Sequence, residues 1–145
     1  LLLPCGRFQR IDGLSIVPHR IDRGTTAPMI IIAGHLEFAD RSDRDAVLAA
    51  GADLQEATRA DEPGCSAYCF SADPTSETRV QVYELWDDQP SLAAHFEHPN
   101  YQRMREVFAL FPRTGGEIKK YRCDLSEPVY DETRTVRADF FTATD

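Results

Sequence analysis

The chain has 145 residues, of which 42% are hydrophobic and 28% charged, which fits one globular domain with a real core and excludes an intrinsically disordered chain. Its formal net charge of −8 argues against a nucleic-acid partner, because an acidic surface repels phosphate backbones. The sequence contains no run of about 18 apolar residues, so it predicts no membrane-spanning helix.

The two ends of the chain differ from its middle. Residues 1–28 are basic and contain six glycines and prolines without a hydrophobic period, and Met29 stands directly before a strong strand pattern. We expect residues 1–28 to be a flexible arm or an added extension. Residues 29–125 are expected to form the folded domain, and residues 126–145 form a polar, acidic tail for which no secondary structure is predicted.

Strand and helix patterns alternate through the middle of the chain. Three isoleucines begin a β-branched run typical of a central strand, and apolar residues then recur at helical spacing behind Ser42, the expected N-cap. The expected strands span residues 30–38, 65–72, 79–87 and 117–125, and the expected helices span residues 40–60 and 88–111, the second interrupted at Pro99. Asn100 is the expected N-cap after this break, and Pro112 with Gly115 and Gly116 is expected to end the helix. The order β-α-β-β-α-β predicts a ferredoxin-like α+β fold, with the helices on one face of an antiparallel sheet.

The four cysteines, Cys5, Cys65, Cys69 and Cys123, predict neither a disulfide framework nor a metal site. Cys65 and Cys69 lie on one predicted strand, about 13 Å apart, which is too far for a disulfide bond. Their spacing matches no zinc-binding pattern. The interpretation is reduced cysteines in a cytoplasmic protein.

The strand at residues 79–87 and the following helix hold the first group of candidate functional residues. Strand alternation places Glu84 and Trp86 on a mostly apolar face, where a carboxylate and an indole each need a polar partner. The helix then brings His95 within reach. His95 either ties the helix to the sheet through a hydrogen bond to Glu84, or acts as a general base, for which an imidazole is suited near neutral pH.

A second group of candidates has a plain structural alternative in each case. His35 shares a strand face with Ile31 and Ala33, so it is either a satisfied core histidine or a functional group beside Gly34, whose missing side chain leaves room for a close approach. Four residues at helical spacing form either plain core or the wall of a ligand cavity: Tyr101, Met104, Phe108 and Phe111.

Three motifs carry a family resemblance: IIIAGHLEF at residues 30–38, EPGC at residues 62–65, and YELWDDQPSLAAHFEHPNY at residues 83–101, with its E-x-W followed by Ala94 and His95. From Met29 to Leu125 the chain resembles the antibiotic biosynthesis monooxygenases, dimeric α/β-barrel proteins that include small quinol monooxygenases. The chain departs from the family pattern at two places. Asn100 stands where a second histidine is common, with His98 nearby, and His35 stands where haem-degrading members have asparagine.

The resemblance implies a cofactor-independent monooxygenase that oxidises a quinol, an anthrone or a similar aromatic with O₂, using no metal. It implies His95 as the first choice of base and His35 as the second, with Trp86 stacking on the substrate ring. The implied substrate-contacting residues are Glu84, Tyr101, Met104, Phe108 and Phe111. It also implies a homodimer paired through the open face of the sheet.

Two alternatives stay open beside the monooxygenase interpretation. One is a protein that binds or degrades haem, with His35, His95 or His98 as the axial ligand. The other is a non-enzymatic dimer that binds a small ligand.

Overall fold

The computed structural model describes residues 27–142, so nearly all of the expected extension and the last residues of the tail lie outside the described part. The described elements are β1 (Met29–Phe38), α1 (Arg41–Asp61), β2 (Cys65–Ala72), β3 (Arg79–Trp86), α2 (Gln89–Glu97), α3 (Pro99–Ala109) and β4 (Arg113–Cys123). The predicted β-α-β-β-α-β order is confirmed, and the second predicted helix is divided into α2 and α3 at Pro99.

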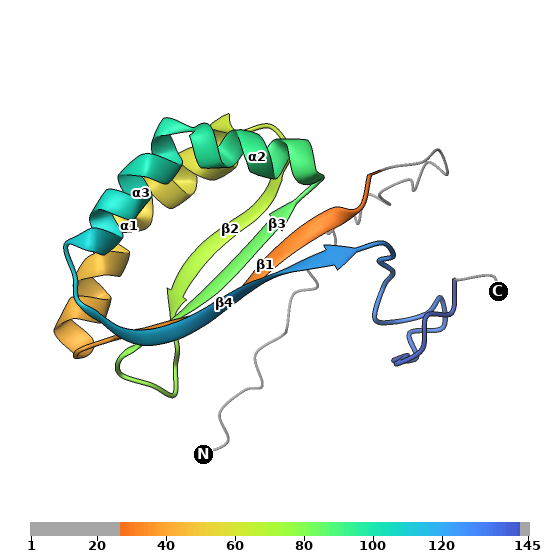
Figure 1. The fold of residues 1–145 in the computed structure, drawn as a ribbon. Helices are drawn as coiled ribbons and strands as arrows, with labels where there is room; N and C mark the ends of the chain where they lie inside the picture. Colours follow the sequence, from red (N-terminus) through yellow and green to blue (C-terminus); the bar gives the residue numbers. More distant parts are fainter. Residues whose placement is uncertain (1–26, 143–145) are drawn as a thin grey trace, which may run out of the picture.

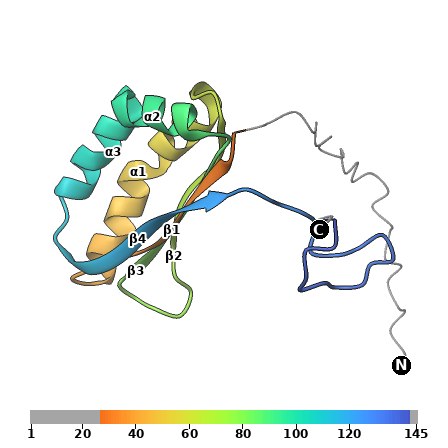
Figure 2. The ribbon, with the colours of Figure 1, turned by 45° about the vertical axis from the view of Figure 1, so that its right-hand side comes forward.

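One four-stranded antiparallel sheet forms the base of the molecule, in the order β2-β3-β1-β4. All three helices lie on the same face of this sheet, and the opposite face carries no helix (Figures 1 and 2). This is the α+β arrangement that the sequence predicts. None of the described helices has the length and apolar character needed to cross a membrane.

Strand alternation divides the side chains between the two faces. Leu36 and Phe38 of β1 and Val80 and Val82 of β3 point toward the helices and form one core cluster with Val47 of α1. A second cluster lies at the other end of the helix-covered face and consists of Tyr68, Trp86, Leu92 and Met104. Each large apolar side chain removed from water stabilises the fold by about 1.5–3 kcal/mol, so these two clusters hold helices and sheet together.

Three of the expected element ends are wrong, each because a local hydrogen bond or a strand pairing decides the end. Helix α1 is capped by Asp40, and not by Ser42, because the Asp40 carboxylate accepts a bond of 2.9 Å from the Asp43 N–H. The N-cap of α3 is His98, whose Nδ1 accepts from the N–H of Asn100. Strand β4 begins at Arg113, four residues earlier than expected.

The early start of β4 changes the role of two glycines that were expected to end the preceding helix. Gly115 and Gly116 instead pair with Glu37 and Leu36 of β1. Gly34 of β1 has a related role. Its φ is +154°, and a Cβ there would lie 2.0 Å from the carbonyl oxygen of Glu117, so the space beside Gly34 is filled by the β4 backbone and not by a ligand.

The described part of the acidic tail has local structure that the sequence does not predict. The Glu127 carboxylate accepts hydrogen bonds of 2.8 Å from the N–H groups of Phe141 and Thr142, and Tyr130 pairs with Val136. These contacts fold residues 127–142 back on themselves beyond the end of β4 (Figure 2).

Replacing Gly34 with alanine tests the close approach of β1 and β4. We expect Gly34→Ala to lower the free energy of unfolding by more than about 2 kcal/mol, because the new Cβ collides with backbone at a strained φ. The measurement is urea unfolding followed by circular dichroism. The control is Gly115→Ala, where the Cβ would meet only the Glu37 side chain at 3.9 Å and the change should stay within about 1 kcal/mol. Equal losses in both variants would contradict this account.

Candidate active site

The turn after α1 carries a buried carboxylate. Glu62 is the C-cap of α1, and its N–H donates to the carbonyl of Thr58. The following Pro63 and Gly64 turn the chain into β2, with Gly64 at a φ of +82°. This turn leaves Glu62 only 6% exposed, beneath the junction of α2 and α3.

Three side chains from the α2–α3 segment converge on this carboxylate. His95 Nδ1 lies 2.7 Å from one oxygen of Glu62. Asn100 donates from its side-chain amide to the other oxygen at 3.2 Å, and His98 Nδ1 lies 3.1 Å from that same oxygen. Asn100, one of the two positions at which the sequence departs from the family pattern, therefore contacts Glu62, as does the neighbouring His98. The carboxylate joins the end of α1 to both later helices.

His95 is held in one orientation by this bond and by a surround of aromatic rings. The ring centroids of Trp86, Tyr101, Tyr68 and Phe96 lie 4.5, 5.0, 5.3 and 5.8 Å from that of His95. Burial lowers the pKa of His95, and the bond to Glu62 opposes this shift only in part. The imidazole is therefore the neutral form at physiological pH.

The proton on the neutral ring of His95 is assigned by its partner. A carboxylate only accepts, so Nδ1 carries the proton and Nε2 keeps its lone pair. Nε2 has no hydrogen-bond partner among the described residues, and the His95 side chain is only 1% exposed.

Glu84 and Trp86 form a second polar pair at the same end of the sheet. The indole Nε1–H of Trp86 donates to Glu84 at 3.0 Å. Burial raises the pKa of Glu84 to about 7, the bond from Trp86 opposes this, and the negative charge of Glu62 adds to it. The structural alternative in which His95 bonds to Glu84 is wrong, because Glu62 takes that bond.

One nitrogen of His98 has two competing partners. Its Nδ1 accepts the N–H of Asn100 at 3.2 Å as the cap of α3, and the same atom lies 3.1 Å from Glu62. A lone pair is needed for the first contact and a proton for the second, so only one can be a hydrogen bond at a time.

His35 lies on the opposite face of the sheet from His95. Its register partners are Gln81 of β3 and Glu117 of β4, and its Nε2 lies 3.9 Å from a Glu37 oxygen. The side chain is 34% exposed. The sheet itself separates the two histidines that the sequence proposes as alternative bases.

The four aromatic and apolar candidates that were expected on one helix are spread along the core, and Phe111 lies beyond the end of α3. Tyr101 contacts His95, and Met104 packs in the cluster that contains Trp86. Phe108 packs against both clusters, and Phe111 lies at the far end beside the first cluster. Only Tyr101 and Met104 are therefore close to the His95 end.

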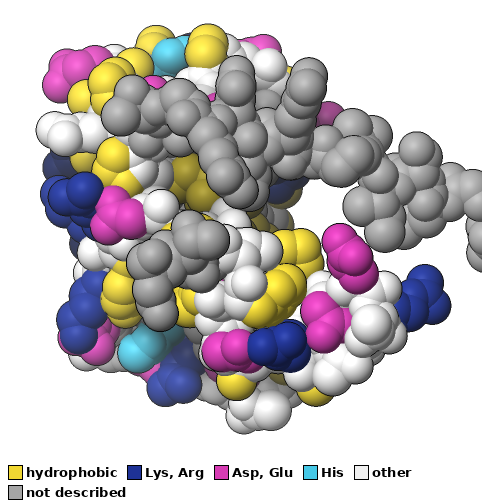
Figure 3. Space-filling model, turned by 90° about the vertical axis from the view of Figure 1, so that its right-hand side faces the viewer, with side chains coloured by type: hydrophobic (Ala, Val, Ile, Leu, Met, Phe, Trp, Pro, Cys, Tyr) yellow, Lys and Arg dark blue, Asp and Glu magenta, His cyan; other side chains and the backbone are white. Residues whose placement is uncertain are grey.

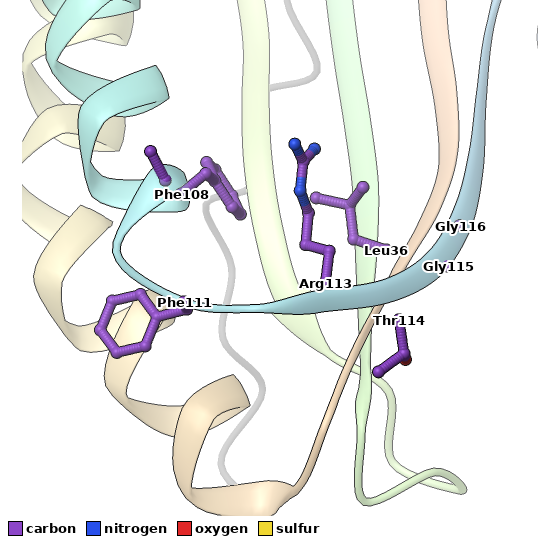
Figure 4. A pocket seen from close by; sticks show the side chains of 8 residues that line it. Leu36, Phe108, Phe111, Arg113, Thr114, Gly115 and Gly116 are labelled. Carbon is purple, nitrogen blue, oxygen red and sulfur yellow. The ribbon is translucent and has the colours of Figure 1, made fainter.

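A hollow of about 530 Å³ lies near Phe108 and Phe111, between the end of α3 and the start of β4 (Figure 4). Leu36 forms part of its floor, whereas Trp86 pairs with Ile30 at the other end of β1. Six residues of strand separate these rows, which is about 20 Å. The hollow and the polar site are therefore distinct places.

Sequence reasoning missed Glu62 and Asn100. The available signal was the EPGC motif, in which a carboxylate directly precedes a Pro-Gly turn. Neither residue stands out by helical or strand periodicity, because each lies at an element end. In residues 27–142 no group of three or more His, Cys, Asp and Glu side chains is arranged to hold a metal ion.

Comparison with known proteins gives a family match and a fold match. The sequence profile described as antibiotic biosynthesis monooxygenase matches residues 29–107. An uncharacterized protein of Synechocystis is 27% identical over 93 residues, which cover 64% of this chain and 62% of that protein. The match thus spans less than two thirds of that relative's length.

Solved structures with the same fold come from several bacteria. One from Caulobacter crescentus, named as a candidate antibiotic biosynthesis monooxygenase, has a TM-score of 0.61 and 20% identity, covering 70% of this chain and 93% of its own. One from Deinococcus radiodurans with the same description has a TM-score of 0.60 and 20% identity, covering 68% and 96%. A Bacteroides fragilis protein, described as dimeric with a ferredoxin-like fold, has a TM-score of 0.53 and 13% identity, covering 65% and 95%. At these identities the likeness shows the fold alone.

The raised pKa of Glu84 predicts a pH-dependent stability. Between pH 4.5 and about 7 the unfolded chain has released this proton while the folded chain keeps it, so stability falls as pH rises through this window. Glu84→Gln removes the titration and keeps an acceptor for Trp86. We expect the variant to gain about 3 kcal/mol relative to the unmodified chain between pH 4.5 and 7.

The measurement is urea unfolding at several pH values in this window. The matched control is Glu56→Gln on the exposed surface of α1, which should follow the unmodified chain at each pH. Parallel pH profiles for the Glu84 variant and the unmodified chain would contradict the assignment.

Proposed function

We propose, from the premise that this chain belongs to the antibiotic biosynthesis monooxygenase family, that it oxidises an electron-rich aromatic such as a quinol or an anthrone with O₂ and without a cofactor. The observation that carries the proposal is the buried pair of Glu62 and His95, joined at 2.7 Å. This pair leaves one imidazole nitrogen free to take a proton from a bound substrate.

The first chemical step is proton abstraction by Nε2 of His95. Burial keeps the ring neutral and able to accept, and the Glu62 carboxylate stabilises the imidazolium that forms. The pair thus combines a base with an orienting acid, as in other carboxylate–histidine dyads. Glu84, which holds a proton over part of the neutral pH range, offers a hydrogen-bond donor to the substrate anion.

The second step uses the electrons of the substrate itself. For an anthrone, the carbanion gives its electrons to O₂ and a carbon–oxygen bond forms, which yields a hydroperoxide after protonation. Loss of water then leaves a carbonyl group. The CH₂ group and O₂ have become C=O and H₂O, so no external reductant is needed. The protein supplies orientation, exclusion of water and stabilisation of the anion.

Access to His95 requires that part of its aromatic surround moves. Phe96 and Tyr101 contact the imidazole and each other, with centroids 5.1 Å apart, and Phe96 is 37% exposed. Tyr68 and Trp86 are almost fully buried and serve as the fixed walls. We therefore propose that Phe96 and Tyr101 cover His95 and that a planar substrate displaces their rings when it binds.

The open sheet face supports the further proposal that two copies pair through it. Tyr83 of β3 and Tyr121 of β4 are 44% and 51% exposed, and their register partners on β1 are Ala33 and Ile31. Hydrophobic side chains appear among charged ones on this side of the molecule (Figure 3). The neighbour from Bacteroides fragilis is described as dimeric, which agrees with this use of the face.

Oxygen uptake with hydroquinones and anthrones, in the absence of added flavin, haem or metal, tests the proposed reaction. After subtraction of auto-oxidation, we expect His95→Ala to lower the rate about 100-fold or more. Glu62→Gln should also lower it strongly, because an amide that donates to Nδ1 shifts the ring proton to Nε2 and blocks the base.

His35→Ala is the matched comparison for this assay, since it removes the alternative base on the other face. If only His35→Ala lowered the rate of oxygen uptake, the base would be His35 on the open face of the sheet. Uptake that is equal in all variants would remove both histidines from the chemistry. Absence of uptake together with a Soret shift on haem titration would replace the proposed function by haem binding.

Sedimentation velocity at micromolar concentration tests the dimer. We expect the unmodified chain to sediment as a dimer and Tyr83→Asp with Tyr121→Asp to sediment as a monomer, because two charges would be buried without partners. Val136→Asp is the control, as it changes an exposed apolar residue outside the sheet. A monomeric unmodified chain, or dissociation by the Val136 variant alone, would contradict the proposed interface.

A further inference from the structure

We propose that the hollow between the end of α3 and the start of β4 binds a small planar organic anion, with Arg113 recognising its charge. The hollow lies about 20 Å along the sheet from the row of Trp86, so its ligand is not the molecule that His95 would deprotonate. The inference therefore stands independently of the proposed oxygenation.

The hollow is an open surface depression of about 530 Å³, and its walls expose more polar than apolar surface. This volume is enough for a compound of one or two rings. Leu36, Phe108 and Phe111 supply apolar surface, and the main chain of β4 supplies polar surface along one side (Figure 4). A ligand with a flat apolar body and one polar end matches this division.

Arg113 is the charged group of this site. Figure 4 shows its guanidinium extending over the hollow, on the side of Leu36 and Phe108. It has no ion pair or side-chain hydrogen bond to another described residue, whereas Arg79 is bonded to Glu37 at 2.6 Å and Arg44 to Asp45 at 2.7 Å. A guanidinium presents five donors, and its planar fork fits a carboxylate or sulfonate.

The start of β4 keeps the hollow free of protein side chains. Gly115 and Gly116 carry none, and a Cβ on Gly116 would lie 2.6 Å from the carbonyl oxygen of His35 at a φ of +134°. The register between β1 and β4 also shifts at Glu37 and Phe38, which bends the first residues of β4. β4 is also an edge strand, and no other strand in residues 27–142 pairs with its outer side.

Calorimetric titration with 2-naphthoate, compared with the neutral 2-naphthamide, tests the charge recognition. We expect the carboxylate to bind at least tenfold more tightly than the amide. Arg113→Gln should abolish that preference, and Arg113→Lys should keep part of it. The control is Arg105→Gln on α3, whose guanidinium stacks on Tyr101 and which should leave naphthoate binding unchanged.

Amide NMR spectra locate the bound molecule. We expect shifts for Gly115 and Gly116, while the indole resonance of Trp86, the single tryptophan, should stay in place. Equal binding of acid and amide, naphthoate binding that is insensitive to Arg113→Gln, or a shift of the indole resonance instead of the glycines would each overturn the proposal. The proposal would also be overturned if naphthoate did not bind at millimolar concentration. These binding measurements do not depend on oxygen uptake. The ligand proposal and the oxygenation proposal can therefore fail independently of each other.

Discussion

The buried carboxylate of Glu62 is the constraint on which the candidate active site depends. It accepts from His95 and Asn100, which follow it by 33 and 38 residues, and these two bonds tie the end of α1 to both α2 and α3. Removing the carboxylate would leave buried polar groups without partners, at a cost of about 1–3 kcal/mol for each. The break at Pro99 lets both side chains reach Glu62. In one continuous helix, Asn100 would point away from the carboxylate that His95 binds.

The two ends of the helix-covered face are different in chemistry but continuous in packing. The His95 end holds two carboxylates under aromatic rings, and the Arg113 end holds an open hollow with one cation. Phe108 packs on Phe70, Phe70 on Tyr68, and Tyr68 on His95, with centroid distances of 5.2, 5.2 and 5.3 Å. A close-packed row of this kind is the physical link that coupling between two ligands would need.

The order of strands and helices can be predicted from the sequence because local periodicity and turn residues set it. The family can be recognised because its motifs are short and local. The sequence does not predict the side of the sheet on which His35 lies relative to the helices. Both faces of β1 are apolar, so alternation groups His35 with Ile31 and Ala33 but cannot say which group the helices cover. The role of Gly34 depends on β4, more than 80 residues later, and that of Glu62 depends on helices that begin 27 residues later. Such long-range contacts leave no periodic trace.

The stability of the fold does not require the acid at Glu84. Burying Glu84 raises its pKa to about 7, which costs stability at neutral pH, and replacing buried charged pairs by apolar residues is often neutral or stabilising. The neighbouring positions on the same face of β3, Val80 and Val82, show that apolar residues fit there. A neutral imidazole held by one carboxylate, beside a second carboxyl that titrates near pH 7, is instead the separation of acid and base roles that proton transfer needs. The energetic cost of this arrangement is therefore an argument for chemistry at His95.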